Sequence, residues 1–167
     1  MDEHAKKTAL RMIPYGLYVL TSSDGQGNVA AATINWVTQT SFKPPLVAIG
    51  VKQDSGAHEL IKKTGHFVLN VLGKGKQGVA FGFFKPAELD GHTISGEAFY
   101  TEKTGSPILE CAAAHVECTL VHTYEGGDHS VFVGELVDAG VKETPEGRAD
   151  DFTLLLKDLG EKGFYGG

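Results

Sequence analysis

Residues 115–141, HVECTLVHTYEGGDHSVFVGELVDAGV, decide the fold class, because they contain two β-rich runs around a glycine turn. The first run covers residues 115–124 and the second covers residues 129–141. The EGGD segment between them, at residues 125–128, places two glycines at the tip. Two such runs joined by a short glycine-containing segment are typical of a β-hairpin. We therefore expect neighbouring antiparallel strands in this part of the chain.

Similar runs of β-branched, aromatic and aliphatic residues precede this hairpin. They occupy residues 15–21, 29–40, 46–51 and 66–72. The Asp24-Gly25 turn signal predicts a hairpin loop between the first two runs. Regular structure is expected to stop at residues 42–45, because two consecutive prolines remove two backbone donors. The pattern predicts about six strands.

Helical signals are few and short. Residues 57–63, AHELIKK, predict a helix that begins near Ser55 and ends at Gly65, a typical C-cap residue. The other segments predict a short polar helix, a short apolar helical turn, a long surface loop and an apolar tail segment, at residues 2–12, 79–84, 85–107 and 151–167. No helix of ordinary length regularly separates the strands, which argues against a doubly wound parallel sheet.

The sequence therefore favours a mainly β fold, an antiparallel barrel with short peripheral helices. Glycine accounts for 22 of 167 residues, about 13% against a typical 7%, as expected for a chain with many tight turns. Neither a repeat nor a linker divides the chain, so a single domain over residues 1–167 is expected.

Composition excludes several classes of function. The 15 basic and 21 acidic side chains give a net charge of −6, which disfavours a general nucleic-acid binder. Two cysteines, Cys111 and Cys118, are too few for a disulfide scaffold. The first residues lack the apolar core of a signal peptide, and no apolar run has the length of a membrane span. We expect a cytoplasmic protein.

Two motifs that suggest familiar chemistry are not supported by their context. Residues 73–78, GKGKQG, match G-x-G-x-x-G, but the helical run that follows ends by Phe84, so a dinucleotide-binding βαβ unit is disfavoured. Asp128, His129 and Ser130 are the residue types of a catalytic triad. Neighbouring side chains of a strand point to opposite faces, so these three cannot converge.

The histidines were considered as metal ligands. His115, His122 and His129 are spaced by seven residues, and on a strand an odd spacing alternates faces. No known metal-binding motif accompanies them, so no metal site is expected. His129 alone follows a glycine turn at the start of a strand. It either reaches the mouth of a pocket or remains an exposed turn histidine.

Residues 33–41 form the densest polar stretch within an apparent strand. Hydroxyl and amide groups on a rigid strand can bind a heteroaromatic ring or a phosphate, and a half-exposed strand is the alternative. The candidate residues of this stretch are Thr33, Ile34, Asn35, Trp36, Thr38, Gln39, Thr40 and Ser41. Lys52 and Ser55 lie where a strand meets a helix N-terminus. This position suits a phosphate, although Ser55 is equally explained as an N-cap.

The order of these segments resembles the flavin reductase-like family. The similar segments are YGLYVLTSSDGQGN, AATINWVTQTSFKPPLVAIGV, SGAHELIKKTGHFVLNVL and GGDHSVFVGELV, and the resemblance covers about residues 10–141. The S-x-x-P-P of Ser41–Pro45 and the G-D-H of Gly127–His129 make the resemblance specific. It implies a six-stranded antiparallel split barrel with Greek-key connections, and a homodimer that binds FMN near the subunit interface.

The resemblance also implies an activity and a site. NAD(P)H would deliver a hydride to the flavin, with residues 33–41 around the flavin ring and the phosphate near Lys52 and Ser55. His129 would orient the nicotinamide side of the pocket. Asn35 and Trp36 depart from the small serines of many relatives, and Tyr165 in the GFYGG tail is a candidate to cover the flavin. An electron-transfer flavoprotein reduced by a protein partner, or a non-catalytic flavin-binding barrel, remains an alternative.

Overall fold

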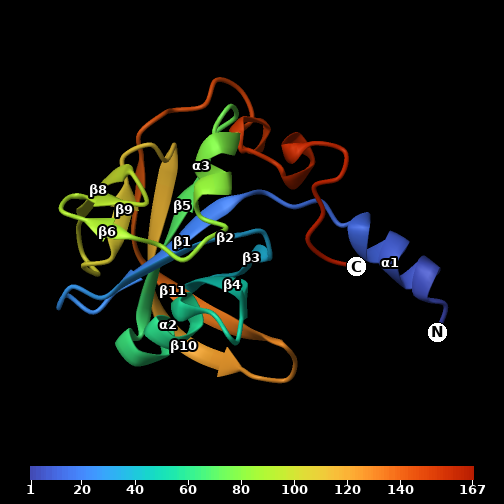
Figure 1. The fold of residues 1–167 in the computed structure, drawn as a ribbon, viewed down its shortest axis with the longest axis horizontal. Helices are drawn as coiled ribbons and strands as arrows, with labels where there is room; N and C mark the ends of the chain where they lie inside the picture. The colour runs from blue at the N-terminus through green and yellow to red at the C-terminus, as the bar shows by residue number, and fades with distance from the viewer.

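The computed structural model describes all 167 residues (Figure 1). Its helices are α1 (Glu3–Arg11), α2 (Gly56–Thr64) and α3 (Gln77–Gly82), followed near the C-terminus by two 3-10 helices, Ala149–Phe152 and Leu156–Leu159. The strands are β1 (Tyr18–Ser23), β2 (Val29–Ile34), β3 (Val37–Phe42), β4 (Pro45–Lys52), β5 (His66–Val71), β6 (Leu89–Asp90), β7 (Thr93–Ile94), β8 (Glu97–Thr101), β9 (Pro107–Leu109), β10 (Ala114–Tyr124) and β11 (His129–Val141).

Seven strands form one sheet in the order β2-β1-β5-β10-β11-β4-β3, and every neighbouring pair is antiparallel. The two edge strands, β2 and β3, are consecutive in the chain and are separated only by Asn35 and Trp36. Ile34 and Val37 are three residues apart (37 − 34 = 3) and so at most about 11 Å from each other, which means that the two edges of the sheet must approach each other there. The sheet therefore curls into a barrel that is split between β2 and β3.

The corner at Asn35 and Trp36 shows that one predicted strand is wrong. Residues 29–40 were expected to form a single strand, but the chain turns at Asn35 and Trp36 and continues as β3. The barrel sheet consequently has seven strands instead of six. Regular structure also does not stop at residues 42–45, because these residues form the tight turn between β3 and β4, and Phe42 pairs with Pro45. The mainly β barrel with short peripheral helices is confirmed.

The interior of the barrel is one apolar core, closed at one end by α2. Residues Leu20, Ile49, Phe67 and Phe132 from four strands pack there against Ile61 of the helix. Ser55 caps α2, since its hydroxyl accepts a hydrogen bond from the backbone N–H of His58, 3.2 Å away. Gly65 ends the helix in the left-handed region with a φ of 75°. The predicted helix and both of its ends are confirmed.

A second core lies on the outer face of the barrel at β1 and β2, under α3 and a small sheet of β6, β7, β8 and β9 (Figure 1). Ile94, Ile108 and Leu109 of that sheet are fully buried. The prediction of a long surface loop over residues 85–107 is therefore wrong. These strands are only two to five residues long, too short for an alternation of apolar and polar residues to be recognisable.

The C-terminal tail runs beside helix α1, which projects from the barrel (Figure 1). Helix α1 has no buried residue, and the guanidinium of Arg11 lies 4.3 Å from the centre of the Phe164 ring. The tail is held to the barrel by Leu154, whose carbonyl accepts a hydrogen bond from the N–H of Leu17. No helix has the length and apolar character needed to cross a membrane.

Candidate functional site

The candidate site is built on the corner where the barrel is split. Trp36 leaves β2 at this corner and packs flat over β4, where its carbonyl accepts a hydrogen bond from the N–H of Gly50. A Cβ atom at Gly50 would lie 2.9 Å from the indole ring, so only glycine admits the ring this close to the backbone. The position of Trp36 is thus fixed by the sequence of the neighbouring strand.

Three aromatic rings meet at the corner. The ring centres of Trp36 and His129 are 4.7 Å apart, and those of Trp36 and Tyr165 are 5.5 Å apart. The hydroxyl of Tyr165 lies 2.7 Å from His129 Nε2. The backbone carbonyl of Tyr165 accepts a hydrogen bond from Asn35 Nδ2 at 3.1 Å. The C-terminal tail is therefore bound across the corner by residues of the barrel.

The protonation of His129 follows from its two partners. Nδ1 lies 2.9 Å from a carboxylate oxygen of Asp128, and this hydrogen bond lowers the pKa of Asp128. An ionised carboxylate only accepts, so the hydrogen bond from Nδ1 favours, for the neutral imidazole, the tautomer in which Nε2 is the acceptor. Burial raises the pKa of Tyr165, although nearby Lys52 opposes this effect, so the phenol stays protonated and donates to Nε2. His129 thus presents a hydrogen-bond acceptor at the mouth of the corner.

Beside the corner lies a cleft of about 470 Å³, within the range typical of small-molecule sites. Thr33, Ile34 and Asn35 line one side of it. The opposite walls come from α3, from the residues just after it and from the C-terminal tail. They include Phe81, Phe83, Phe84, Lys162 and Tyr165. Flat apolar walls with an amide and a hydroxyl at one edge suit a planar heteroaromatic ligand.

One polar atom at the corner has no partner. Trp36 Nε1 is buried and makes no hydrogen bond, and it lies beneath Gly166 of the tail. A buried donor without an acceptor costs about 1–3 kcal/mol, so such atoms are rare in folded proteins and each requires an explanation. The indole N–H is therefore a donor available to a ligand once the tail moves.

The predicted residues of the polar stretch separate into two groups. Thr33, Ile34, Asn35 and Trp36 are brought together at the cleft and the corner. The others, Thr38, Gln39, Thr40 and Ser41, lie beyond the corner on edge strand β3, and the first three are exposed. Residues 33–41 are not one regular strand, because the chain turns at Asn35 and Trp36 and a bulge lies between Gln39 and Ser41.

Lys52 and Ser55 lie near the corner, at the junction of β4 and α2. Lys52 pairs with His129 across the two strands, and its ammonium lies 3.1 Å from a carboxylate oxygen of Asp54. Ser55 acts as the N-cap of α2, and its hydroxyl donates to the carbonyl of Lys52 at 2.7 Å. The N-cap explanation of Ser55 is therefore confirmed.

His129 and Ser130 face opposite ways, as predicted. Ser130 is buried, and its hydroxyl lies 2.7 Å from His58 Nε2. Sequence reasoning missed Lys162 and the three phenylalanines that α3 and the residues after it contribute to the cleft, Phe81, Phe83 and Phe84. The run VAFGFF at residues 79–84 was the available signal for the phenylalanines, but it was interpreted only as a helical turn. Lys162 had no signal, because one lysine in a charged tail carries no pattern.

Comparison with known proteins gives consistent results. A family model described as "Flavin reductase like domain" matches residues 10–159. A flavin reductase of Pseudomonas putida is 30% identical over 167 residues, which cover 100% of this chain and 91% of the relative. An NADH-dependent FAD reductase of Streptomyces globisporus is 33% identical over 129 residues, which cover 75% of this chain and 69% of the relative.

Solved structures show the same fold. The NADH:FAD oxidoreductase SgcE6 of Streptomyces globisporus, solved in complex with NAD and FAD fragments, superposes with a TM-score of 0.67. It is 32% identical, and the match covers 78% of this chain and 76% of that chain. The same overall fold therefore occurs in a protein that was solved with NAD and FAD fragments.

Proposed function

Because the chain belongs to the flavin reductase-like family, we propose that it binds a flavin in the cleft at the β2–β3 corner and orients NAD(P)H against it. The protein is an NAD(P)H:flavin oxidoreductase, in which the flavin, when bound, accepts a hydride from the nicotinamide. The observation that carries the location is the buried, unpartnered N–H of Trp36 beside the cleft. The protein's task is to bind and orient both rings and to exclude water.

The cleft has the properties that a flavin ring requires. A flavin is a flat aromatic ring system with carbonyl oxygens along one edge. The three phenylalanines offer apolar walls to its faces, and the amide of Asn35 offers a donor to its carbonyl edge. The indole N–H of the adjacent Trp36 lies under Gly166 and would become a second donor when the tail moves. Thr33 is less available, because its hydroxyl already donates to the carbonyl of Ala80 at 2.7 Å.

His129 is proposed to orient the nicotinamide. Its Nε2 is an acceptor, held in place by the bond between Nδ1 and Asp128, and a nicotinamide carries a carboxamide N–H that such an acceptor can bind. The hydroxyl of Tyr165 occupies this acceptor at 2.7 Å. Binding of the nicotinamide therefore requires the tail to release His129.

Flavin and NAD(P)H both carry anionic phosphates, so the cations near the site matter for their binding. The chain carries a net charge of −6, so the overall field does not attract an anion. Lys162 lines the cleft, whereas Lys52 is already paired with Asp54. We propose that Lys162 is the main cation for the flavin phosphate, with Lys52 and the start of α2 near Ser55 as a second source.

Further proposals concern assembly and organisation. We propose that the exposed β3–β4 hairpin packs on a second copy, since Phe42 at its tip is 86% exposed. In that homodimer the residues Thr38–Ser41 would approach the partner's flavin. Light scattering should show a dimer for the natural protein and a weaker one for Phe42→Ser.

We also propose that residues 1–167 form a single domain. We further propose a cytoplasmic location, which the two unpaired cysteines support.

Anaerobic mixing with NADH and with NADPH, in the presence of FMN or FAD, tests the function. We expect loss of the visible absorption of the flavin at a rate that saturates with nucleotide concentration. Absence of bleaching with both nucleotides would reject the reductase and favour the alternative of electron transfer from a protein partner. The visible spectrum after gel filtration tells whether the flavin is retained or exchanged.

A further inference from the structure

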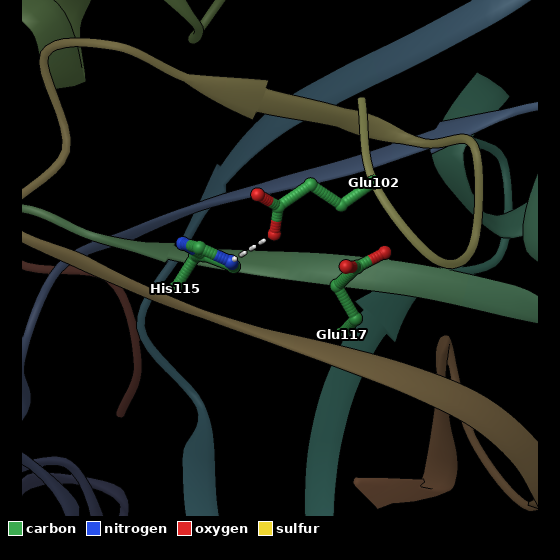
Figure 2. A group of neighbouring side chains, drawn as sticks. All are labelled: Glu102, His115 and Glu117. Atoms are coloured by element: carbon green, nitrogen blue, oxygen red, sulfur yellow. Dashed lines mark ion pairs between the residues drawn. The ribbon is translucent and has the colours of Figure 1, made fainter. Parts of the chain in front are cut away.

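A second group of polar side chains lies away from the flavin cleft, between the barrel and the small sheet. His115 and Glu117 are two residues apart on β10, so both point to the same face of that strand. Glu102 follows directly after β8 and reaches toward them from the opposite side (Figure 2). One ligand atom from each of the three residues lies within 4.8 Å of the other two.

His115 is buried without a hydrogen bond. Its side chain is only 4% exposed, and neither ring nitrogen has a hydrogen-bond partner. Nε2 points toward Glu102 and lies 3.5 Å from one of its carboxylate oxygens (Figure 2). The Nδ1–Cε1–Nε2 edge of the ring packs closely on Gly140 of the paired strand β11, where a Cβ atom would collide with it. The imidazole is thus rigid and directed into the cluster.

Glu117 is fully buried and has no cationic partner. Its carboxylate accepts hydrogen bonds from the backbone N–H groups of Lys103 and Thr104, at 3.1 and 2.7 Å, and from the Thr104 hydroxyl at 2.6 Å. The ammonium groups of Lys103 and Lys142 donate instead to the backbone carbonyls of Val137 and Leu109. A buried carboxylate ordinarily has a compensating charge. Here that charge is missing.

We propose that Glu102, His115 and Glu117 bind a divalent transition-metal cation, with zinc as the best match. Zinc commonly takes imidazole nitrogen and carboxylate oxygen ligands in a tetrahedron, with water in an open position. At zinc–ligand distances of about 2.0–2.2 Å, the ligand atoms of a tetrahedron are about 3.3 Å apart. The separation between His115 and Glu102 already meets this value. The half-exposed side chain of Glu102 is free to close the remaining gap.

The choice of cation follows from the donor set. Magnesium and calcium prefer oxygen ligands, whereas imidazole suits zinc and related transition metals. One nitrogen of His115 remains without an outer hydrogen-bond partner, and such partners typically contribute about 10–100-fold to metal affinity. We therefore expect a site of micromolar affinity.

The role of this site is separate from the flavin chemistry. His115 pairs with Gly140 on β11, and His129 lies eleven residues earlier on the same strand (140 − 129 = 11). At about 3.3 Å per residue, roughly 36 Å of strand separates the two positions. The metal would fasten the turn after β8 to β10, and would supply the positive charge that Glu117 lacks.

Titration calorimetry of the chelator-treated, full-length protein with zinc chloride tests the site. We expect one saturable equivalent of zinc, which Glu102→Gln and His115→Gln abolish. His122→Gln is the matched control, because His122 is an exposed histidine of the same strand outside the cluster. Glu102→Gln changes a half-exposed side chain, so this variant is expected to fold even if His115→Gln does not.

Thermal unfolding gives a second readout. Zinc at about 100 times its Kd should raise the folded-to-unfolded ratio about 100-fold, and so raise the Tm of the natural protein but not that of Glu102→Gln. The proposal is overturned if zinc binding does not saturate, if both cluster variants bind as the natural protein does, or if His122→Gln removes the binding. Equal competition by magnesium would also overturn it.

Discussion

Replacing Tyr165 with phenylalanine tests whether the C-terminal tail competes with the nicotinamide for His129. The substitution keeps the ring beside Trp36 and removes only the hydroxyl that donates to His129 Nε2 at 2.7 Å. The tail would still be held by the bond from Asn35 to the carbonyl of Tyr165. The change therefore isolates one hydrogen bond between the tail and the proposed nicotinamide site.

The expected magnitude follows from that single bond. A side-chain hydrogen bond contributes about 0.5–1.5 kcal/mol net, and each 1.4 kcal/mol corresponds to a factor of ten. When the competent state is a minor fraction, the apparent affinity of a ligand rises in proportion to that fraction. Tyr165→Phe should therefore lower the KM for NADH by roughly two- to tenfold, with kcat little changed.

Steady-state and stopped-flow kinetics with NADH measure both constants. Tyr124→Phe is a suitable control, because Tyr124 is exposed on β10 and lies outside the three-ring cluster. A KM that stays the same in Tyr165→Phe shows that the tail does not compete. A KM that rises, or a kcat that falls, shows that the Tyr165 hydroxyl helps to bind or position the nicotinamide. Either result refutes the reasoning.

Other predictions concern His129, Trp36 and His58. His129→Ala should slow reduction of the flavin by NADH about tenfold or more, while flavin still binds. Unchanged hydride-transfer rates in stopped-flow would show that His129 does not orient the nicotinamide. Trp36→Phe removes the unpartnered N–H and should weaken flavin binding about two- to tenfold in a fluorescence titration, whereas equal affinity would show that the N–H has no ligand acceptor. Burial, with a smaller contribution from Lys62, holds the pKa of His58 below 6.5, and the opposing effect of Glu125 is weaker. The unfolded chain therefore binds more protons than the folded one as the pH falls through about 6.5, so the free energy of unfolding decreases there. Urea unfolding at about pH 7.5 and about pH 5.5 should show this decrease, and a smaller one in His58→Gln; no difference between the two proteins would contradict it.

The strands with strong local signals were predictable from the sequence, and those with weak ones were not. The glycine turn at residues 125–128 and the long runs on both sides gave β10 and β11 within one residue of their bounds. Helix α2 was equally clear, because its cap at Ser55 and its end at Gly65 are local features. The strands β6 to β9 stay together only because Ile94 and Ile108 bury against the rest of the chain, which no local pattern records.

The candidate site was predictable only as a set of residues along the chain. Thr33 to Trp36 were found from the polar stretch and the family resemblance, but the corner that brings them to a cleft depends on how the sheet closes. The contact between Asn35 and Tyr165 spans 130 positions, and that between His129 and Tyr165 spans 36. No spacing rule pairs residues at such separations. The cluster of Glu102, His115 and Glu117 matches no metal-binding motif, because Glu102 follows a different strand, 13 residues before His115 (115 − 102 = 13), although His115 and Glu117 share a strand face.

One movement of the tail would serve both ligands. Tyr165 covers the acceptor of His129, and the adjacent Gly166 covers the N–H of Trp36. Lys162, in contrast, lines the cleft and must stay to bind a phosphate. The movement therefore has to occur after Lys162, where Gly163 and Gly166 offer a flexible backbone. If the tail uncovers both sites in a single equilibrium, both ligands select the same open state of the tail. Tyr165→Phe should then multiply the flavin affinity and the apparent NADH affinity by the same factor. If the two affinities change by unequal factors, the rings of His129 and Trp36 are uncovered by separate motions of the tail.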